Sequence, residues 1–170
     1  MSSTTFDKND MSYANNRHYS REDYINLVKY AAERKIRVLP EIDFPGHSRA
    51  VVEALRAYER RTGDSSYAPT HPEDKSVFAS VQGVGDNTFD IGMESTYKFM
   101  ALVFDRLIEM HNEAGAPLTE IHIGGDEVNM PQWKKCPDCS AWLKKRGYTD
   151  GHKLEDMFIG RIQAILAKYG

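Results

Sequence analysis

Two short segments rich in β-branched residues, at 36–43 and 120–125, restrict the folds that this chain can form, because each directly follows a segment with helical periodicity. Those helical segments cover residues 20–34 and 94–113, and another helical segment at 48–63 follows the first strand. Strands that are separated by helices pair in parallel through right-handed crossovers. The order of elements therefore predicts an α/β fold.

Two strands alone do not complete a fold of this class, since a parallel sheet is covered on both faces and needs further strands. The 170 residues are also fewer than the roughly 250 of a whole barrel of alternating strands and helices. We therefore expect residues 20–170 to form part of a larger (β/α)8 barrel of the TIM type, with a last helix at 154–169. Residues 1–19 are polar and lack periodicity, which predicts a loop or a disordered end.

Both predicted strands end in residues suited to acid–base chemistry. The first strand leads into Asp43 and His47, and the second leads through two glycines into Asp126 and Glu127. Because parallel strands place their carboxyl ends on one face, we expect these four side chains to converge. Neighbouring side chains on a regular strand point to opposite faces, so Asp126 and Glu127 share a pocket only where the strand has turned. The two glycines make that turn easy because they tolerate positive φ.

Adjacent carboxylates such as Asp126 and Glu127 suit the cleavage of a glycosidic bond. In a site of low dielectric constant both cannot ionise cheaply, so one stays anionic while the other holds a proton. The pair then supplies a proton donor for the leaving oxygen and a negative group for the charge that develops on the sugar. His47 is a candidate to tune or relay that proton. Each strand end taken alone also fits an ordinary solvated turn, but two acidic ends on one face are a rarer coincidence.

The charge balance argues against nucleic acid as a partner. The chain has 22 Lys and Arg residues against 25 Asp and Glu residues, a net charge of -3, and no basic stripe is expected from it. No apolar run approaches the length of about 18 residues that a membrane span needs. Residues 1–5 have neither the basic nor the apolar stretch of a signal peptide, so the sequence itself indicates no cellular compartment.

The two cysteines, Cys136 and Cys139, form a Cys-Pro-Asp-Cys motif after the second strand. A zinc site usually needs a second such pair or histidines at set spacing, and His152 is the only histidine that follows. A thioredoxin-like motif would follow a strand, which the flanking residues do not indicate. We interpret both as cysteines of a loop or a helix start, with a local disulfide and a metal site as alternatives.

The two strand ends together resemble the β-N-acetylhexosaminidases of glycoside hydrolase family 20, including the bacterial chitobiase-like members. The resemblance lies in Glu-Ile-Asp-Phe-Pro-Gly-His at residues 41–47 and His-Ile-Gly-Gly-Asp-Glu at residues 122–127, and it extends over most of the chain from about residue 18. The fold of that family is a (β/α)8 barrel. The resemblance therefore implies that this chain supplies about the second helix through the fourth helix of such a barrel.

The resemblance implies a retaining exo-β-N-acetylhexosaminidase that acts on terminal GlcNAc or GalNAc by substrate-assisted catalysis. In that mechanism the 2-acetamido oxygen of the sugar attacks the anomeric carbon and forms an oxazolinium-type intermediate. Carried over, Glu127 is the general acid and then the base, Asp126 holds the acetamido nitrogen, and His47 and Asp43 support Glu127 through hydrogen bonds. No metal or cofactor is needed. The expected partner is an oligosaccharide or glycoconjugate that ends in N-acetylhexosamine, and the parent protein is expected to be periplasmic or secreted.

The resemblance also indicates which parts of the sugar pocket this chain lacks. The arginine that grips the sugar hydroxyls comes from the first strand of the family barrel, and the pocket tryptophans and an acetamido-contacting tyrosine come from the fifth strand onward. We therefore expect this chain to carry the acid–base half of the site without the walls that bind the sugar. At residues 89–92 the sequence Phe-Asp-Ile-Gly also lacks the proline expected before the third barrel helix.

Two other hypotheses stay open at this point. A metal-dependent barrel hydrolase would use His47, Asp43, His122 and Asp126 as ligands, although no two histidines lie at close ligand spacing. Alternatively, the isolated chain is catalytically silent. A partial barrel exposes apolar helix faces and unpaired strand edges, so such a chain is expected to self-associate.

Overall fold

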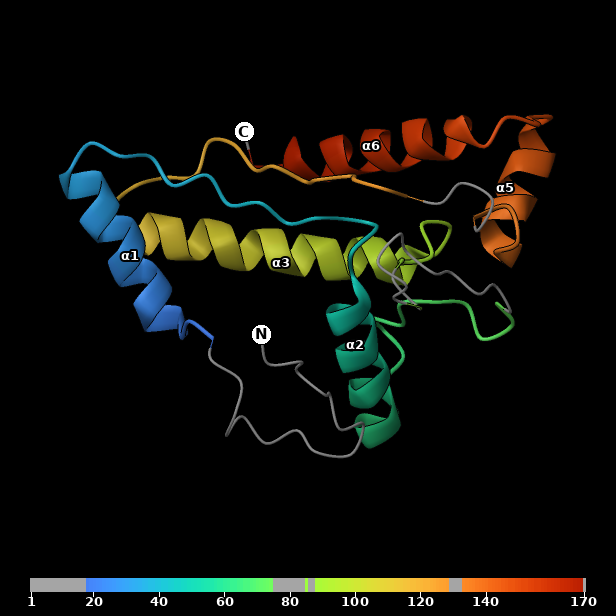
Figure 1. The fold of residues 1–170 in the computed structure, drawn as a ribbon, viewed down its shortest axis with the longest axis horizontal. Coiled ribbons are helices and arrows are strands. Elements are labelled where there is room, and N and C mark those ends of the chain that lie inside the picture. The colour runs from blue at the N-terminus through green and yellow to red at the C-terminus, as the bar shows by residue number, and fades with distance from the viewer. Residues whose placement is uncertain (1–17, 75–84, 86–87, 129–132, 170) are drawn as a thin grey trace.

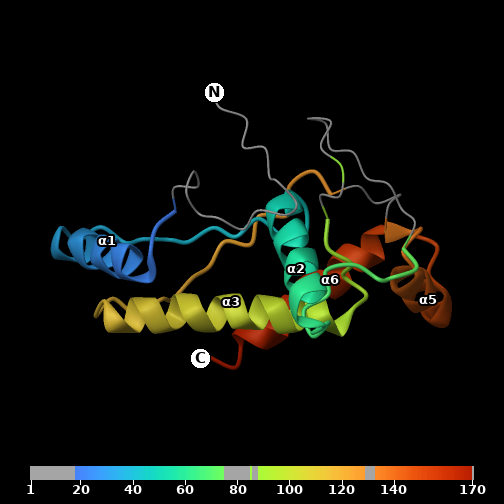
Figure 2. The same ribbon diagram turned by 90° about the horizontal axis from the view of Figure 1, so that it is seen from below.

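The computed structural model describes residues 18–74, 85, 88–128 and 133–169, which form helices joined by extended segments (Figure 1). The helices are α1 (Arg21–Glu33), α2 (Arg49–Thr62), α3 (Glu94–Glu113), α5 (Pro137–Arg146) and α6 (His152–Leu166). The long helix α3 contacts α1 and α6, and α6 contacts α5. Helix α2 runs across the direction of α3 in both views (Figure 2). A loop or disordered end was expected at residues 1–19, and residues 1–17 of it lie outside the described residues.

The helices at the expected places are confirmed, and their ends follow from local chemistry. Helix α1 starts with a capping box, in which the Ser20 hydroxyl accepts from the Asp23 amide at 3.1 Å and the Asp23 carboxylate accepts from the Ser20 amide at 2.9 Å. Ser48 lies at the N-cap of α2, but its hydroxyl donates to the Gly46 carbonyl at 2.7 Å instead of capping the helix. None of the helices in the described part of the chain is long and apolar enough to cross a bilayer.

The prediction of two regular strands is wrong, because none of the described residues is assigned to a strand. The segments do run in parallel, and they meet at one isolated bridge between Glu41 and His122. The His122 amide donates to the Pro40 carbonyl at 3.0 Å, and the Ile42 amide donates to the His122 carbonyl at 2.9 Å. A parallel pair without further strands beside it has little to hold a regular ladder. The exposure of apolar Ile36 agrees with this, since 59% of that residue is accessible.

Helix α5 begins at the cysteine motif, where the sequence predicted either a loop or a helix start. Cys136 is its N-cap residue, Pro137 occupies the first turn, and Gly147 ends the helix with a φ of 69°. A proline at the start and a glycine just past the end are common helix boundaries. The interpretation of the cysteines as belonging to a helix start is confirmed, and both are free and buried in the structure.

The hydrophobic core lies around the first half of α3 and includes residues that precede or follow the extended segments. Its members come from all the helices except α1 and from the connecting segments: Phe44, Val52, Phe89, Ile91, Tyr97, Met100, Phe104, Trp133, Cys136, Cys139, Leu143, Leu154, Phe158 and Ile162. Phe44 immediately follows Asp43, and its ring meets that of Phe89 edge-on at 5.2 Å between centroids. The core therefore anchors the chain next to the first of the predicted site residues.

Candidate active site

The loops that follow the two extended segments cross each other at close range. The Gly125 amide donates to Oδ1 of Asp43 at 3.0 Å, although the two residues are 82 positions apart. A Cβ atom at Gly124 would lie 2.7 Å from the Cα atom of Asp43, and one at Gly46 would lie 2.9 Å from the Asp126 carbonyl oxygen. Glycine at these two positions therefore permits a separation of the two backbones that any side chain would prevent.

His47 and Glu127 face each other across this crossing. Nε2 of His47 lies 3.5 Å from Oε2 of Glu127, and 30% and 45% of the two side chains are accessible to solvent. Both residues have backbone angles in the left-handed region, with φ values of 46° and 52°. Such a conformation costs a non-glycine residue of order 1–3 kcal/mol and often occurs at functional sites. The strained backbone at both His47 and Glu127 is therefore a second observation, independent of their contact, that indicates a functional site here.

Asp126 lies in the turn between Gly125 and Glu127 and is exposed. The turn follows from the left-handed φ values of 65° at Gly124 and 104° at Gly125. The expected break in the extended segment is therefore present, and the two carboxylates do not alternate as they would on a strand. One carboxylate pairs with an imidazole, and the other is presented to solvent.

The first loop is fixed by groups that the sequence reasoning did not single out. The Ser48 hydroxyl, which is buried, lies 3.4 Å from the Asp43 carbonyl as well as donating to Gly46. The Phe89 amide donates to the Pro45 carbonyl at 3.0 Å. A serine two residues after a turn glycine is a weak sequence signal, and the partner at Phe89 is 44 residues away, so neither contact follows from the local pattern.

The four ligands of the alternative metal hypothesis do not gather around one point. His47 pairs with Glu127, Asp43 accepts from the Gly125 amide, and Nδ1 of His122 lies 3.5 Å from Oε1 of Glu41 on the exposed side of the bridge. Within the described residues, the group whose potential ligand atoms lie within 4.8 Å of one another is a different one, Asp90, Cys136 and Cys139. The arrangement at the crossing favours proton transfer through paired side chains over metal ligation.

Comparisons with known proteins identify the family of the chain. The catalytic domain of glycosyl hydrolase family 20 matches residues 2–170. A β-hexosaminidase of Vibrio vulnificus is 36% identical over 162 residues, which cover 90% of this chain and 19% of that protein. An N,N'-diacetylchitobiase of Vibrio harveyi is 40% identical over 119 residues, which cover 65% of this chain and 14% of that protein.

Solved structures of the same family are also similar to the chain. One similar structure is the crystal structure of a family 20 exo-β-N-acetylglucosaminidase from Vibrio harveyi in complex with N-acetylglucosamine. The two superimpose with a TM-score of 0.74 at 30% identity, and the superposition covers 89% of this chain and 21% of the Vibrio harveyi chain. The chain thus spans about a fifth of the length of these relatives. The neighbours imply a TIM-barrel catalytic domain, of which the largely helical structure described above is a fragment. The chain belongs to glycosyl hydrolase family 20.

Proposed function

We propose that the protein containing this chain is a retaining exo-β-N-acetylhexosaminidase that hydrolyses terminal N-acetyl-β-D-hexosamine residues. The observation that carries the proposal is the crossing of the two loops, where His47 lies beside Glu127 and Asp43 holds the Gly125 amide. Membership of family 20 and the names of the relatives support it. One solved neighbour, described as an inactive mutant, has an aspartate replaced by alanine.

In this proposal Glu127 first gives a proton to the glycosidic oxygen as the bond to the anomeric carbon breaks. The acetamido oxygen of the substrate attacks that carbon, and Asp126 accepts a hydrogen bond from the acetamido N–H, which stabilises the positive charge of the oxazolinium ring. Glu127, now a carboxylate, then removes a proton from the water that opens the ring. Two inversions at the anomeric carbon leave its configuration retained.

His47 and Asp43 act through their neighbours. His47 orients the Glu127 carboxyl group from 3.5 Å. Asp43 holds the turn that presents Asp126 and Glu127, because its carboxylate accepts from the Gly125 amide inside that turn. We place the chain at about the second helix through the fourth helix of the barrel, so that the walls of the sugar pocket come from other parts of the whole protein. We also propose, from the family resemblance alone, that the whole protein is periplasmic or secreted.

The test is the turnover of aryl N-acetyl-β-glucosaminides by the whole protein and its variants. Glu127→Gln should lower kcat by roughly 10²–10⁴, the usual contribution of a general acid–base group. The loss should be smaller for a substrate whose leaving group needs no protonation. Asp126→Asn should lower kcat for good and poor leaving groups alike, because its role concerns the acetamido group.

Glu120→Gln is the matched control, since this exposed carboxylate lies in the same extended segment and pairs with Arg37 at 3.0 Å, away from the crossing. It should leave turnover unchanged. Rates near that of the unmodified protein for both Glu127→Gln and Asp126→Asn would exclude the proposed roles.

The isolated 170-residue chain is proposed to be inactive, because the walls of the sugar pocket come from other parts of the whole protein. It is also proposed to self-associate, because Ile36 and Leu39 of the first extended segment are exposed. Sedimentation velocity of the isolated chain should show species larger than the 19.4 kDa monomer. A monomer that cleaves the aryl substrate would contradict this part of the proposal.

A further inference from the structure

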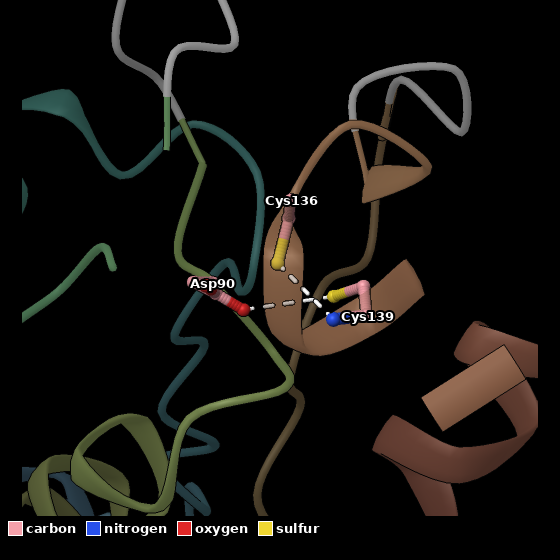
Figure 3. A group of neighbouring side chains, drawn as sticks. All are labelled: Asp90, Cys136 and Cys139. Atoms are coloured by element: carbon pink, nitrogen blue, oxygen red, sulfur yellow. Dashed lines mark hydrogen bonds between the residues drawn. The ribbon is translucent and has the colours of Figure 1, made fainter. Parts of the chain in front are cut away.

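Three buried side chains with potential metal-ligand atoms meet where the start of α5 packs against the segment that precedes α3 (Figure 3). Asp90 comes from that segment, Cys136 is the N-cap residue of α5, and Cys139 lies in the first turn of α5. Their accessible fractions are 2%, 2% and 0%, and their potential ligand atoms all lie within 4.8 Å of one another. The cluster is separate from the loop crossing that holds Glu127.

One carboxylate oxygen of Asp90 makes no hydrogen bond within the described part of the chain. Oδ1 of Asp90 accepts from the Gly92 amide at 2.8 Å and from the Cys139 thiol at 3.5 Å. Its other oxygen, Oδ2, is buried and has no hydrogen-bond partner among the described residues. Buried polar atoms are nearly always satisfied, so an orphan of this kind points to a ligand. In Figure 3 the carboxylate is directed toward the two cysteines.

The local backbone suits the binding of a thiolate at Cys136. The Cys139 amide donates to the Cys136 sulfur at 3.2 Å, and the sulfur lies at the N-terminus of α5, where the helix dipole favours negative charge. A backbone amide that donates to a ligand sulfur also holds that ligand in place. Two sulfurs and one carboxylate oxygen form a donor set that suits Zn²⁺, which takes four ligands in a tetrahedron.

We propose that Asp90, Cys136 and Cys139 bind one Zn²⁺ ion, with a water molecule as the fourth ligand. Zinc–sulfur bonds of about 2.3 Å would place the two sulfurs roughly 3.8 Å apart, so the cluster has to contract by about 1 Å or less. Binding releases the two thiol protons to solvent and gives Oδ2 or Oδ1 of Asp90 a cationic partner. The ion would link the segment before α3 to the start of α5, and it takes no part in the proposed glycoside hydrolysis.

Cobalt substitution tests the proposal on the unmodified protein. The metal-free, reduced protein that contains this chain is titrated with Co²⁺ and then with Zn²⁺. One Co²⁺ should bind per chain with the near-ultraviolet absorption of sulfur-to-cobalt charge transfer, and one equivalent of Zn²⁺ should remove that absorption. Saturation without the charge-transfer band would overturn the proposal, as would two thiols that still react with a thiol reagent in excess Zn²⁺. If the protein as isolated has a mass lower by two hydrogens, its two cysteines form a disulfide. Failure to bind one metal ion per chain after that disulfide is reduced would also overturn the proposal.

Variants then assign the ligands. Asp90→Asn keeps the shape of the side chain, and Cys136→Ser removes the sulfur at the N-cap while keeping an acceptor there. Each should weaken Zn²⁺ binding by about tenfold or more, since even partners outside the ligand set change affinity by that amount. Asp138→Asn is the control, because this half-exposed residue lies between the cysteines but pairs with His71 at 4.0 Å. It should keep the affinity of the unmodified protein, and equal affinity in all three variants would contradict the assignment.

Discussion

Replacing Gly124 with alanine tests whether the close approach of the two loops builds the site. Gly124 has a φ of 65°, and a Cβ atom there would lie 2.7 Å from the Cα atom of Asp43. The substitution therefore has two separate costs, one from the backbone conformation and one from the contact. Both act at the point where the Gly125 amide meets the Asp43 carboxylate.

The size of each cost can be estimated. A left-handed conformation costs an ordinary L-residue about 1–2 kcal/mol. A methyl group forced into a packed contact costs about 1–3 kcal/mol, because its neighbours have to move. The nearest atom is Oδ1 of the Asp43 carboxylate, which can rotate away, but the Cα atom at 2.7 Å belongs to the backbone and moves less readily.

Gly115→Ala separates the two costs. Gly115 has a φ of 71°, but a Cβ atom there would meet nothing within 4 Å. This variant therefore has the conformational cost alone. In urea, where stability changes by about 1–3 kcal/mol per molar, the unfolding midpoint of Gly124→Ala should fall below that of Gly115→Ala by roughly 1 M. Turnover of an aryl N-acetylglucosaminide by the whole protein should also fall in Gly124→Ala and not in Gly115→Ala.

Equal midpoints together with equal turnover in the two variants would refute the reasoning. That result would mean that the loops separate freely, and that the hydrogen bond between Asp43 and Gly125 does not fix the site. Equal midpoints with lowered turnover in Gly124→Ala alone would show that the contact affects catalysis and not stability.

Three further predictions concern single contacts. Asp43→Ala should lower kcat/KM in the same assay and destabilise by about 0.5–1.5 kcal/mol, because the exposed Gly125 amide exchanges its carboxylate acceptor for water; unchanged values of both would contradict its positioning role. Ser20→Ala should cost about 0.5–2 kcal/mol in thermal unfolding followed by circular dichroism, since α1 loses its cap. Phe104→Ala should cost about 3–5 kcal/mol in urea, because this ring is fully buried in the core; a loss below 1 kcal/mol would show that the core around α3 is loosely packed.

The helices were predictable because their signals are local. The capping box at Ser20 and Asp23 lies within four residues, and the apolar positions of α3 repeat at helical spacing over Glu94–Glu113. The parallel direction of the extended segments followed from the helices between them. The regular strands did not form, since a ladder depends on neighbours that no pattern within residues 36–43 can supply.

The site was predictable only in outline. The sequence indicated that Asp126 and Glu127 lie in a turn after Gly125, because glycine permits it. It did not indicate that His47 and Glu127 both take left-handed backbone angles, since few residues other than glycine take them, although histidine does so more often than glutamate. The cluster of Asp90 with the cysteines was also missed, because the 49 positions between Asp90 and Cys139 hide the contact from any local pattern.

The backbone angles of His47 and Glu127 have a consequence for how this site can change by mutation. Glycine at position 127 would relax the backbone while it removes the carboxylate, so the protein would gain stability as it loses its proposed acid. Valine, isoleucine or threonine there would cost stability as well as activity, because branched side chains fit this conformation poorly. Selection for stability alone would therefore tend to remove Glu127, and its retention in a stable protein depends on selection for the activity.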